Sequence, residues 1–161
     1  MRLSEHPDGI EIGDGRHVVY DLVAGEAFLG AATVSSYALL WELDDPGPGH
    51  VVRCDRVDFP PGGVAYRHVH PGPGIRRLLH GELTIDRGDG DLRSYGAGES
   101  WHEAADDPVL ARASATEDTA FVRVMVLPAE WAGRRTIRYL DPADEDEPRL
   151  QRATVLLEAS L

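Results

Sequence analysis

Two histidines separated by one residue, His68 and His70, lie between two clusters of glycine and proline. The run PGPG at 71–74 follows them directly, and it excludes a helix at this point. On an extended strand, residues two apart project to the same side. The pair therefore predicts a strand that presents two imidazoles on one face, close enough to share an ion, with a turn behind it.

Short runs of strand-like composition, separated by turns about every ten residues, extend over most of the chain. The run 119–127, rich in β-branched and aromatic residues, is the clearest strand. With almost no helical pattern, this succession predicts an all-β fold of the double-sheet jelly-roll type. Further strands are expected at 17–23, 34–43, 51–59, 76–79, 82–86 and 100–104, with a hairpin joining 34–43 to 51–59 and a hairpin turn at 86–91.

The order Gly63, His68, His70, a Gly/Pro turn, an apolar strand and Gly81 resembles the first motif of the cupin family, as does the HGELTI run at 80–85. Downstream, YGAGESWHEAADDPV at 95–109 resembles the second cupin motif. Together the two cover roughly a third of the chain. The resemblance implies a double-stranded β-helix, the jelly-roll barrel of cupins, with N- and C-terminal strand extensions.

A chain of 161 residues suits a single domain, because a chain of this length buries roughly 70% of the surface that it exposes when unfolded. We expect one cupin-like domain at 1–161, with its core barrel at about 34–128. The N-terminal arm, 1–16, and the C-terminal extension, 129–161, are expected to extend the sheets and to pair across a two-fold interface. The expected assembly is a homodimer.

Two ligand positions of metal-holding cupins carry other residues in this chain. Such cupins add a glutamate shortly after the second histidine, and Gly74 or Ile75 stands there. Their second motif adds one more histidine, and that position falls near Val109 or Leu110. The resemblance therefore leaves a third ligand to be found elsewhere.

Trp101, His102 and Glu103 offer candidates for that third ligand. In cupins the position that matches Trp101 tends to line the cavity, so alternation brings Glu103 inward and sends His102 out. His68, His70 and Glu103 then give two imidazoles and a carboxylate, which suit iron or zinc, with manganese or nickel as further options. His102 would serve if it faced inward. The alternatives are no ion at all and a Glu103 that is bonded to an arginine.

Arg76, Arg77, Trp101 and Arg123 are the candidate substrate-binding residues. One of Arg76 and Arg77 should enter the cavity mouth by alternation, where it needs a carboxylate or an anionic substrate as partner. Arg123, inside an apolar strand, either reaches the pocket or caps a sheet edge. Residues that would carry out catalysis are not assigned by the sequence.

The formal net charge of −12 argues against nucleic-acid or anionic-membrane partners, and all sixteen basic residues are arginine. Cys54 is the only cysteine, so an intrachain disulfide is excluded, and its alternation with Val52 and Arg56 indicates a small core residue. The chain has no signal-peptide pattern and no apolar run near the ~20 residues of a membrane span, so we expect a soluble cytoplasmic protein.

The resemblance implies a metal-dependent enzyme that acts on a small carboxylate- or phenol-bearing organic molecule, as a dioxygenase, decarboxylase, isomerase or cyclase. Two alternatives stay open. One is a non-catalytic barrel that binds a small molecule near the arginines. The other is a metal-free isomerase in which His68 or His70 is the general base and an arginine holds the substrate.

Overall fold

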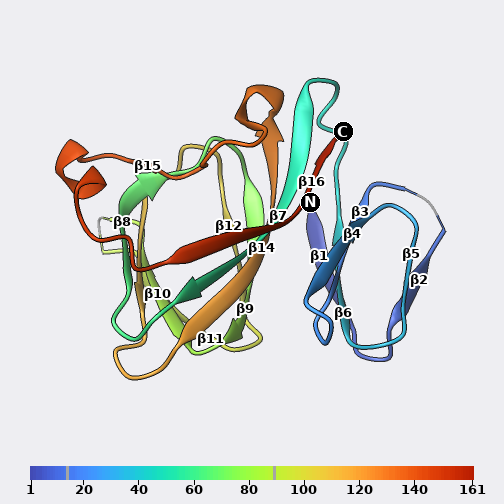
Figure 1. The fold of residues 1–161 in the computed structure, drawn as a ribbon, viewed down its shortest axis with the longest axis horizontal. Helices are drawn as coiled ribbons and strands as arrows, with labels where there is room; N and C mark the ends of the chain where they lie inside the picture. Colours follow the sequence, from blue (N-terminus) through green and yellow to red (C-terminus); the bar gives the residue numbers. More distant parts are fainter. Residues whose placement is uncertain (14, 89) are drawn as a thin grey trace.

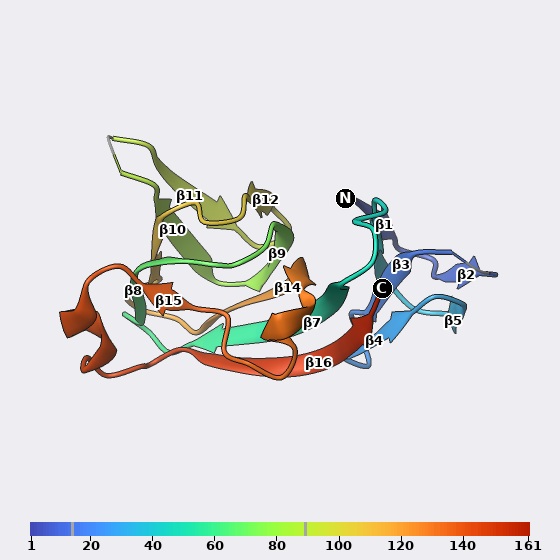
Figure 2. The same cartoon turned by 90° about the horizontal axis from the view of Figure 1, so that it is seen from above.

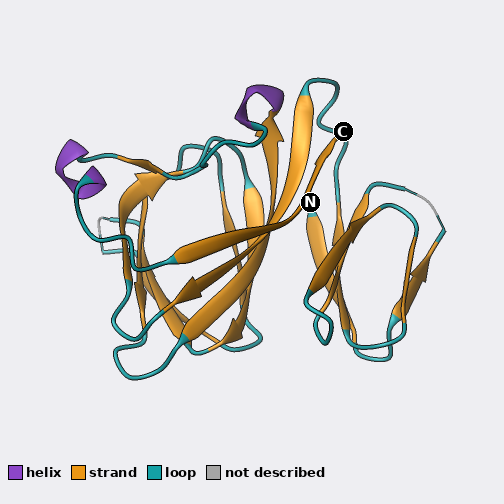
Figure 3. Ribbon diagram, viewed as in Figure 1, coloured by secondary structure: helices purple, strands orange, loops and turns teal. Residues whose placement is uncertain are grey.

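The computed structural model describes residues 1–13, 15–88 and 90–161, and its regular structure is almost entirely β-strand (Figure 3). Two short 3-10 helices also occur in these residues, η1 (Ala129–Trp131) and η2 (Pro142–Glu145). Within the described ranges, no helix is long and apolar enough to cross a membrane. Asp14, in the predicted arm, and Asp89, in the predicted turn at 86–91, lie outside the described residues.

Eight consecutive strands, β7 to β14, form a barrel of two sheets (Figure 1). One sheet has the order β12-β9-β14-β7 and the other has the order β11-β10-β13-β8. The chain crosses between the sheets after most strands, which is the predicted double-sheet jelly roll. The strands are β7 (His50–Phe59), β8 (Val64–Val69), β9 (Gly74–His80), β10 (Glu82–Asp86), β11 (Leu92–Gly96), β12 (Ser100–Glu103), β13 (Val109–Ala113) and β14 (Thr119–Pro128).

The C-terminal segment extends both barrel sheets, as predicted. β16 (Arg152–Ser160) pairs with β7 along almost its whole length, and β15 (Arg138–Tyr139) pairs with β8. Because β16 pairs with the same chain, the strand extension needs no second copy. The homodimer stays a prediction, which light scattering after size-exclusion chromatography would test.

The N-terminal residues form a small sheet of their own, with the order β1-β6-β3-β4, and a separate β2-β5 pair (Figure 2). The strands are β1 (Arg2–His6), β2 (Ile10–Ile12), β3 (His17–Asp21), β4 (Glu26–Leu29), β5 (Ala32–Val34) and β6 (Ala38–Glu42). The prediction of a barrel strand at 34–43 that forms a hairpin with 51–59 is therefore wrong. β6 pairs with β1 and β3 instead, and the barrel begins at His50 rather than near residue 34.

Alternation explains why the N-terminal sheet docks on the barrel. Tyr20 and Trp41 project from β3 and β6 into a buried cluster with Cys54 and Val122, which belong to the outer face of the barrel sheet. The opposite face of β3 carries Val19, which packs toward β2 and β5. The N-terminal sheet thus forms a middle layer that covers one wall of the barrel, and Cys54 is a core residue, as the sequence predicts.

Candidate functional site

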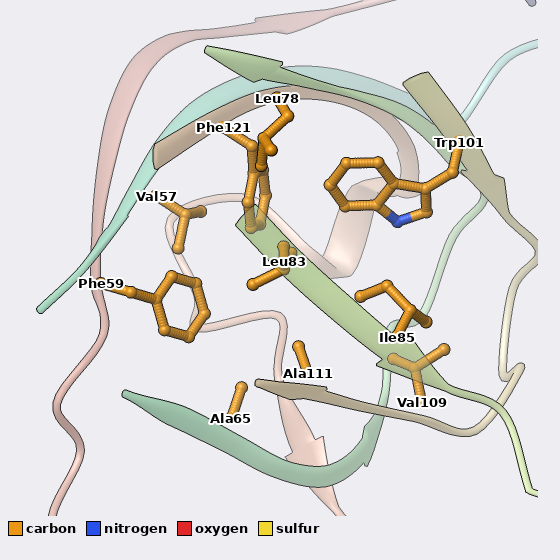
Figure 4. Packing of buried hydrophobic residues seen from close by; sticks show 10 residues of the cluster. All are labelled: Val57, Phe59, Ala65, Leu78, Leu83, Ile85, Trp101, Val109, Ala111 and Phe121. Carbon is orange, nitrogen blue, oxygen red and sulfur yellow. The ribbon is translucent and has the colours of Figure 1, made fainter. Parts of the chain in front are cut away.

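The barrel encloses a cavity of about 600 Å³ that is lined by both apolar and polar side chains. The apolar side chains come from both sheets and face one another across the interior (Figure 4). They include Phe59, Leu83, Trp101 and Phe121, and Trp101 and Phe121 pack edge to face with ring centroids 5.4 Å apart. A cavity of this size and lining is typical of a site for a small organic molecule.

An irregularity in β8 directs the histidines into this cavity. Val109 pairs with His68 and Ala111 pairs with Ala65, so β8 has one more residue than β13 between these pairs. This β-bulge turns both Ala65 and His68 inward although they are three residues apart. His70 follows by ordinary alternation, and both imidazoles are buried in the cavity lining.

The two rings lie 4.9 Å apart between centroids, and each is oriented by a backbone carbonyl. Nδ1 of His68 lies 2.6 Å from the oxygen of Tyr66, and Nδ1 of His70 lies 3.2 Å from the oxygen of Thr136. Because a carbonyl oxygen only accepts, both Nδ1 atoms donate and both Nε2 atoms carry the lone pair. Burial lowers the pKa of His68 to about 4, so the ring is neutral at physiological pH.

Arg123 takes up the lone pair of His70. Its Nη1 donates to Nε2 of His70 across 3.1 Å, while Nε and Nη2 donate to the same carboxylate oxygen of Asp55 at 3.0 and 2.9 Å. Asp55 lies directly opposite Arg123 on β7. Burial and the charge of Arg123 hold the pKa of His70 well below its ordinary value. His70 is therefore a fixed, neutral hydrogen-bond acceptor.

Arg76 and Glu103 form a second buried ion pair, with Nη2 and Oε2 2.7 Å apart. Nη1 of Arg76 donates to the oxygen of Gly74 at 2.7 Å, and Nε1 of Trp101 donates to Glu103 at 2.7 Å. Burial alone would raise the pKa of Glu103, but Arg76 and the hydrogen bond from Trp101 outweigh it, so the pKa lies below its ordinary value. Burial lowers the pKa of Arg76 to about 10, which still leaves it a cation.

β9 and β12 place the other predicted residues. Trp101 and Glu103 are buried in the cavity lining, and His102 between them is exposed. Arg76 enters the cavity, whereas Arg77 points to the outside of the barrel and pairs with Glu5 of β1 at 2.5 Å. The prediction of a substrate-binding Arg77 is therefore wrong, because alternation along β9 gives the cavity only one of the two arginines.

The strand order of the two sheets, with a His-x-His pair at the end of the second barrel strand facing the interior, decides the fold. The chain has the cupin fold. It matches no protein-family model and no curated protein sequence.

Several solved structures, one of them described as cupin-like, are similar to this chain. The polyketide cyclase RemF from Streptomyces resistomycificus is 18% identical over 60% of this chain and 76% of that one, with a TM-score of 0.45. A cupin-like protein from Thermotoga maritima is 16% identical over 58% and 69%, with a TM-score of 0.46. An oxalate oxidase is 21% identical over 60% and 57%, with a TM-score of 0.44. These likenesses concern the fold alone.

The predicted metal ligands of this chain share one cavity but do not fit an ion as they are arranged. Among residues 1–13, 15–88 and 90–161, no group of three or more His, Cys, Asp or Glu side chains is placed to hold a metal. Nε2 of His70 accepts from Arg123, and the Glu103 carboxylate is held by Arg76 and Trp101. Two guanidinium cations beside the donors also oppose a third cation electrostatically.

The two departures from the cupin ligand pattern agree with this arrangement. A Cβ on Gly74 would lie 2.5 Å from the oxygen of Val124, 2.8 Å from Cγ of Met125 and 3.0 Å from Nη1 of Arg76, so the space beside Gly74 is already filled. Val109 is buried in the cavity lining and adds an apolar surface. Glu103 is bonded to an arginine, which is the alternative that the sequence left open, and metal binding at His68, His70 and Glu103 stays a prediction.

Sequence reasoning missed several residues of the site. Asp55 on β7 anchors Arg123, and Tyr139 on β15 lies over His68 with ring centroids 6.2 Å apart. Arg53 on β7 links three segments of the chain. It donates to Glu158 of β16 and to the carbonyl oxygens of Arg134 and Trp131. A partial signal was available: Arg53 and Asp55 share one face of the strand with Val51, Val57 and Phe59, while Arg56 and Asp58 lie on the other face.

Proposed function

We propose that this cupin binds a small organic acid or phenol in its barrel and transfers a proton on it without a metal ion, in the manner of an isomerase or cyclase. The observation that carries the proposal is His68. It is a neutral imidazole in the cavity wall whose Nε2 carries a lone pair, and in the described part of the chain nothing donates to that atom. Beside it lie two buried guanidinium groups, Arg76 and Arg123.

Charge supports an anionic ligand. Six arginines and three carboxylates belong to the described cavity lining, although the chain as a whole carries a formal net charge of −12. Arg134, Arg135 and Arg149 add positive charge where the lining is exposed. Guanidinium groups bind carboxylates with two parallel hydrogen bonds, and the apolar wall suits a hydrocarbon or aromatic body.

The proton-transfer role fits the imidazole chemistry. A base in a cavity must lie within hydrogen-bond reach of the proton that it takes, and Nε2 of His68 is the nitrogen available for this. In the empty cavity burial keeps the pKa of His68 at about 4. An anionic group bound nearby favours the imidazolium and raises that pKa, so the ligand itself makes His68 a better base.

Solvent deuterium exchange tests the proposal. Chelator-treated protein is incubated in D₂O with hydroxy acids, keto acids and phenols, and deuterium incorporation is measured by mass spectrometry. We expect incorporation into at least one compound, its loss in His68→Gln, and its retention in His102→Gln, which changes an exposed histidine on the same barrel. Incorporation that survives in His68→Gln, or that needs an added metal, would overturn the proposal.

A second candidate, a binding barrel without catalysis, is favoured by the low pKa of His68, because a pKa of about 4 makes a weak base. The same panel separates the two candidates. Compounds that stabilise the protein against thermal unfolding but never take up deuterium would support the binding barrel and contradict proton transfer.

A further inference from the structure

The guanidinium of Arg123 bridges an imidazole and a carboxylate. It donates to Nε2 of His70 at 3.1 Å and to the Asp55 carboxylate at 2.9 and 3.0 Å, and Nη2 also reaches Oγ1 of Thr136 at 3.3 Å. An imidazole lone pair and a carboxylate are the donor types that hold zinc, iron and cobalt in proteins. Arg123 therefore occupies the same donors that a transition metal would take.

The surroundings hold this arrangement firmly. Arg123, Asp55 and His70 are all buried, and Arg123 and Asp55 face each other on neighbouring strands. Nδ1 of His70 is already used by the oxygen of Thr136, so His70 has only Nε2 to offer. Nε2 of His68 carries the other lone pair, on a ring 4.9 Å from that of His70.

We propose that Arg123 is the resident cation of this cavity, standing in for a metal ion between His70 and Asp55, and that its removal converts the cavity into a site for a divalent transition metal. Removal of Arg123 would release two donors, Nε2 of His70 and the carboxylate of Asp55, beside Nε2 of His68, and these side chains must move toward one another to share an ion. The inference goes beyond the proposed function, because it names the side chain that keeps the barrel metal-free.

The test compares cobalt uptake by wild-type protein and Arg123→Met. Each protein is loaded with Co²⁺, dialysed against metal-free buffer, and examined by elemental analysis and by the visible absorption of the bound ion. We expect about one equivalent of cobalt on Arg123→Met and no stoichiometric cobalt on the wild-type protein. Arg123→Met/His70→Ala should lose the cobalt, and Arg123→Lys, which keeps a cation beside Asp55, should not gain it.

Arg123→Met leaves Asp55 without its counter-ion, so circular dichroism and thermal unfolding must show that the variant is folded. Arg123→Gln is the second variant, because its amide can still donate to Asp55 without a positive charge. Stoichiometric cobalt on the wild-type protein would overturn both this inference and the proposed function. Folded Arg123→Met and Arg123→Gln proteins that both remain free of cobalt would overturn this inference alone.

Discussion

Arg76 on β9 and Arg123 on β14 lie directly opposite each other, and both side chains are buried in the barrel. Like charges in opposed positions repel each other. Each guanidinium has its own carboxylate, since Glu103 pairs with Arg76 and Asp55 pairs with Arg123. The cavity thus holds two neighbouring ion pairs, in which each buried cation has its counter-ion in place.

Removing one partner of a buried ion pair should be costly. Glu103→Gln leaves Arg76 charged, buried and without its carboxylate, so we expect a loss of about 3–5 kcal/mol in the free energy of unfolding. Urea denaturation measures it. The double variant Arg76→Met/Glu103→Leu should recover most of the loss, because no buried charge is left unpaired. Glu117→Gln, an exposed control, should change little.

Stability should fall with acid because of His68. Burial lowers its pKa from 6.5 to about 4, so between these pH values the unfolded chain binds a proton that the folded chain does not. The free energy of unfolding is therefore not reduced by His68 above about pH 6.5, and it falls by roughly 3 kcal/mol as the pH is lowered from 6.5 to 4. In His68→Gln, the free energy of unfolding measured by urea denaturation should depend less on pH between 4 and 6.5. An unchanged slope in His68→Gln, equal to that of His102→Gln, would contradict the buried neutral imidazole.

A large side chain introduced into the cavity should abolish ligand binding without preventing the protein from folding. Ala111 is a small buried residue of the cavity lining, so Ala111→Phe extends a ring into the cavity. We expect a folded protein that no longer binds compounds bound by the wild-type protein, measured by isothermal titration calorimetry. Ala115→Phe, at an exposed position, should bind normally. Undiminished binding by Ala111→Phe would place the ligand elsewhere.

Cys54 should report on the docking of the N-terminal sheet. The thiol is fully buried beneath Trp41, and burial raises its pKa, so it should react very slowly with a disulfide reagent. Trp41→Ala removes the largest side chain of this contact and should cost about 3–5 kcal/mol. Labelling of Cys54 under native conditions should then accelerate at least tenfold. Equal rates in both proteins would show that the sheet does not protect the thiol.

Local sequence patterns were sufficient to locate the barrel strands, but they could not predict which strands pair with each other. β7, β12 and β14 lie within a residue or two of the predicted runs, because turn chemistry and alternation are properties of neighbouring residues. The run 34–43 has the same local pattern whichever strand it joins, and its pairing with β1 and β3 depends on contacts that are distant in sequence.

In the site, too, the sequence predicted what depends on neighbouring residues and missed what depends on distant contacts. The resemblance to cupins placed Trp101 inside, and alternation on β12 then predicted Glu103 inside and His102 outside, as the structure has them. Nothing in the sequence pattern could say that Arg123 occupies the lone pair of His70, because that contact joins residues 53 positions apart. A motif supplies the types of donor atom, and only the packed barrel determines which lone pairs remain free.

Arg53 connects three stretches of chain at the rim, and its carboxylate partner, Glu158, follows every other residue of the described cavity lining in sequence. During synthesis, the barrel strands β7–β14 are therefore complete before β16, which carries the last residues of the cavity lining, has been made. Until β16 pairs with β7, the cavity lacks the side chains that β16 contributes to its lining. A compound that binds in the cavity should therefore accelerate the docking of β16 more than the initial collapse of the chain.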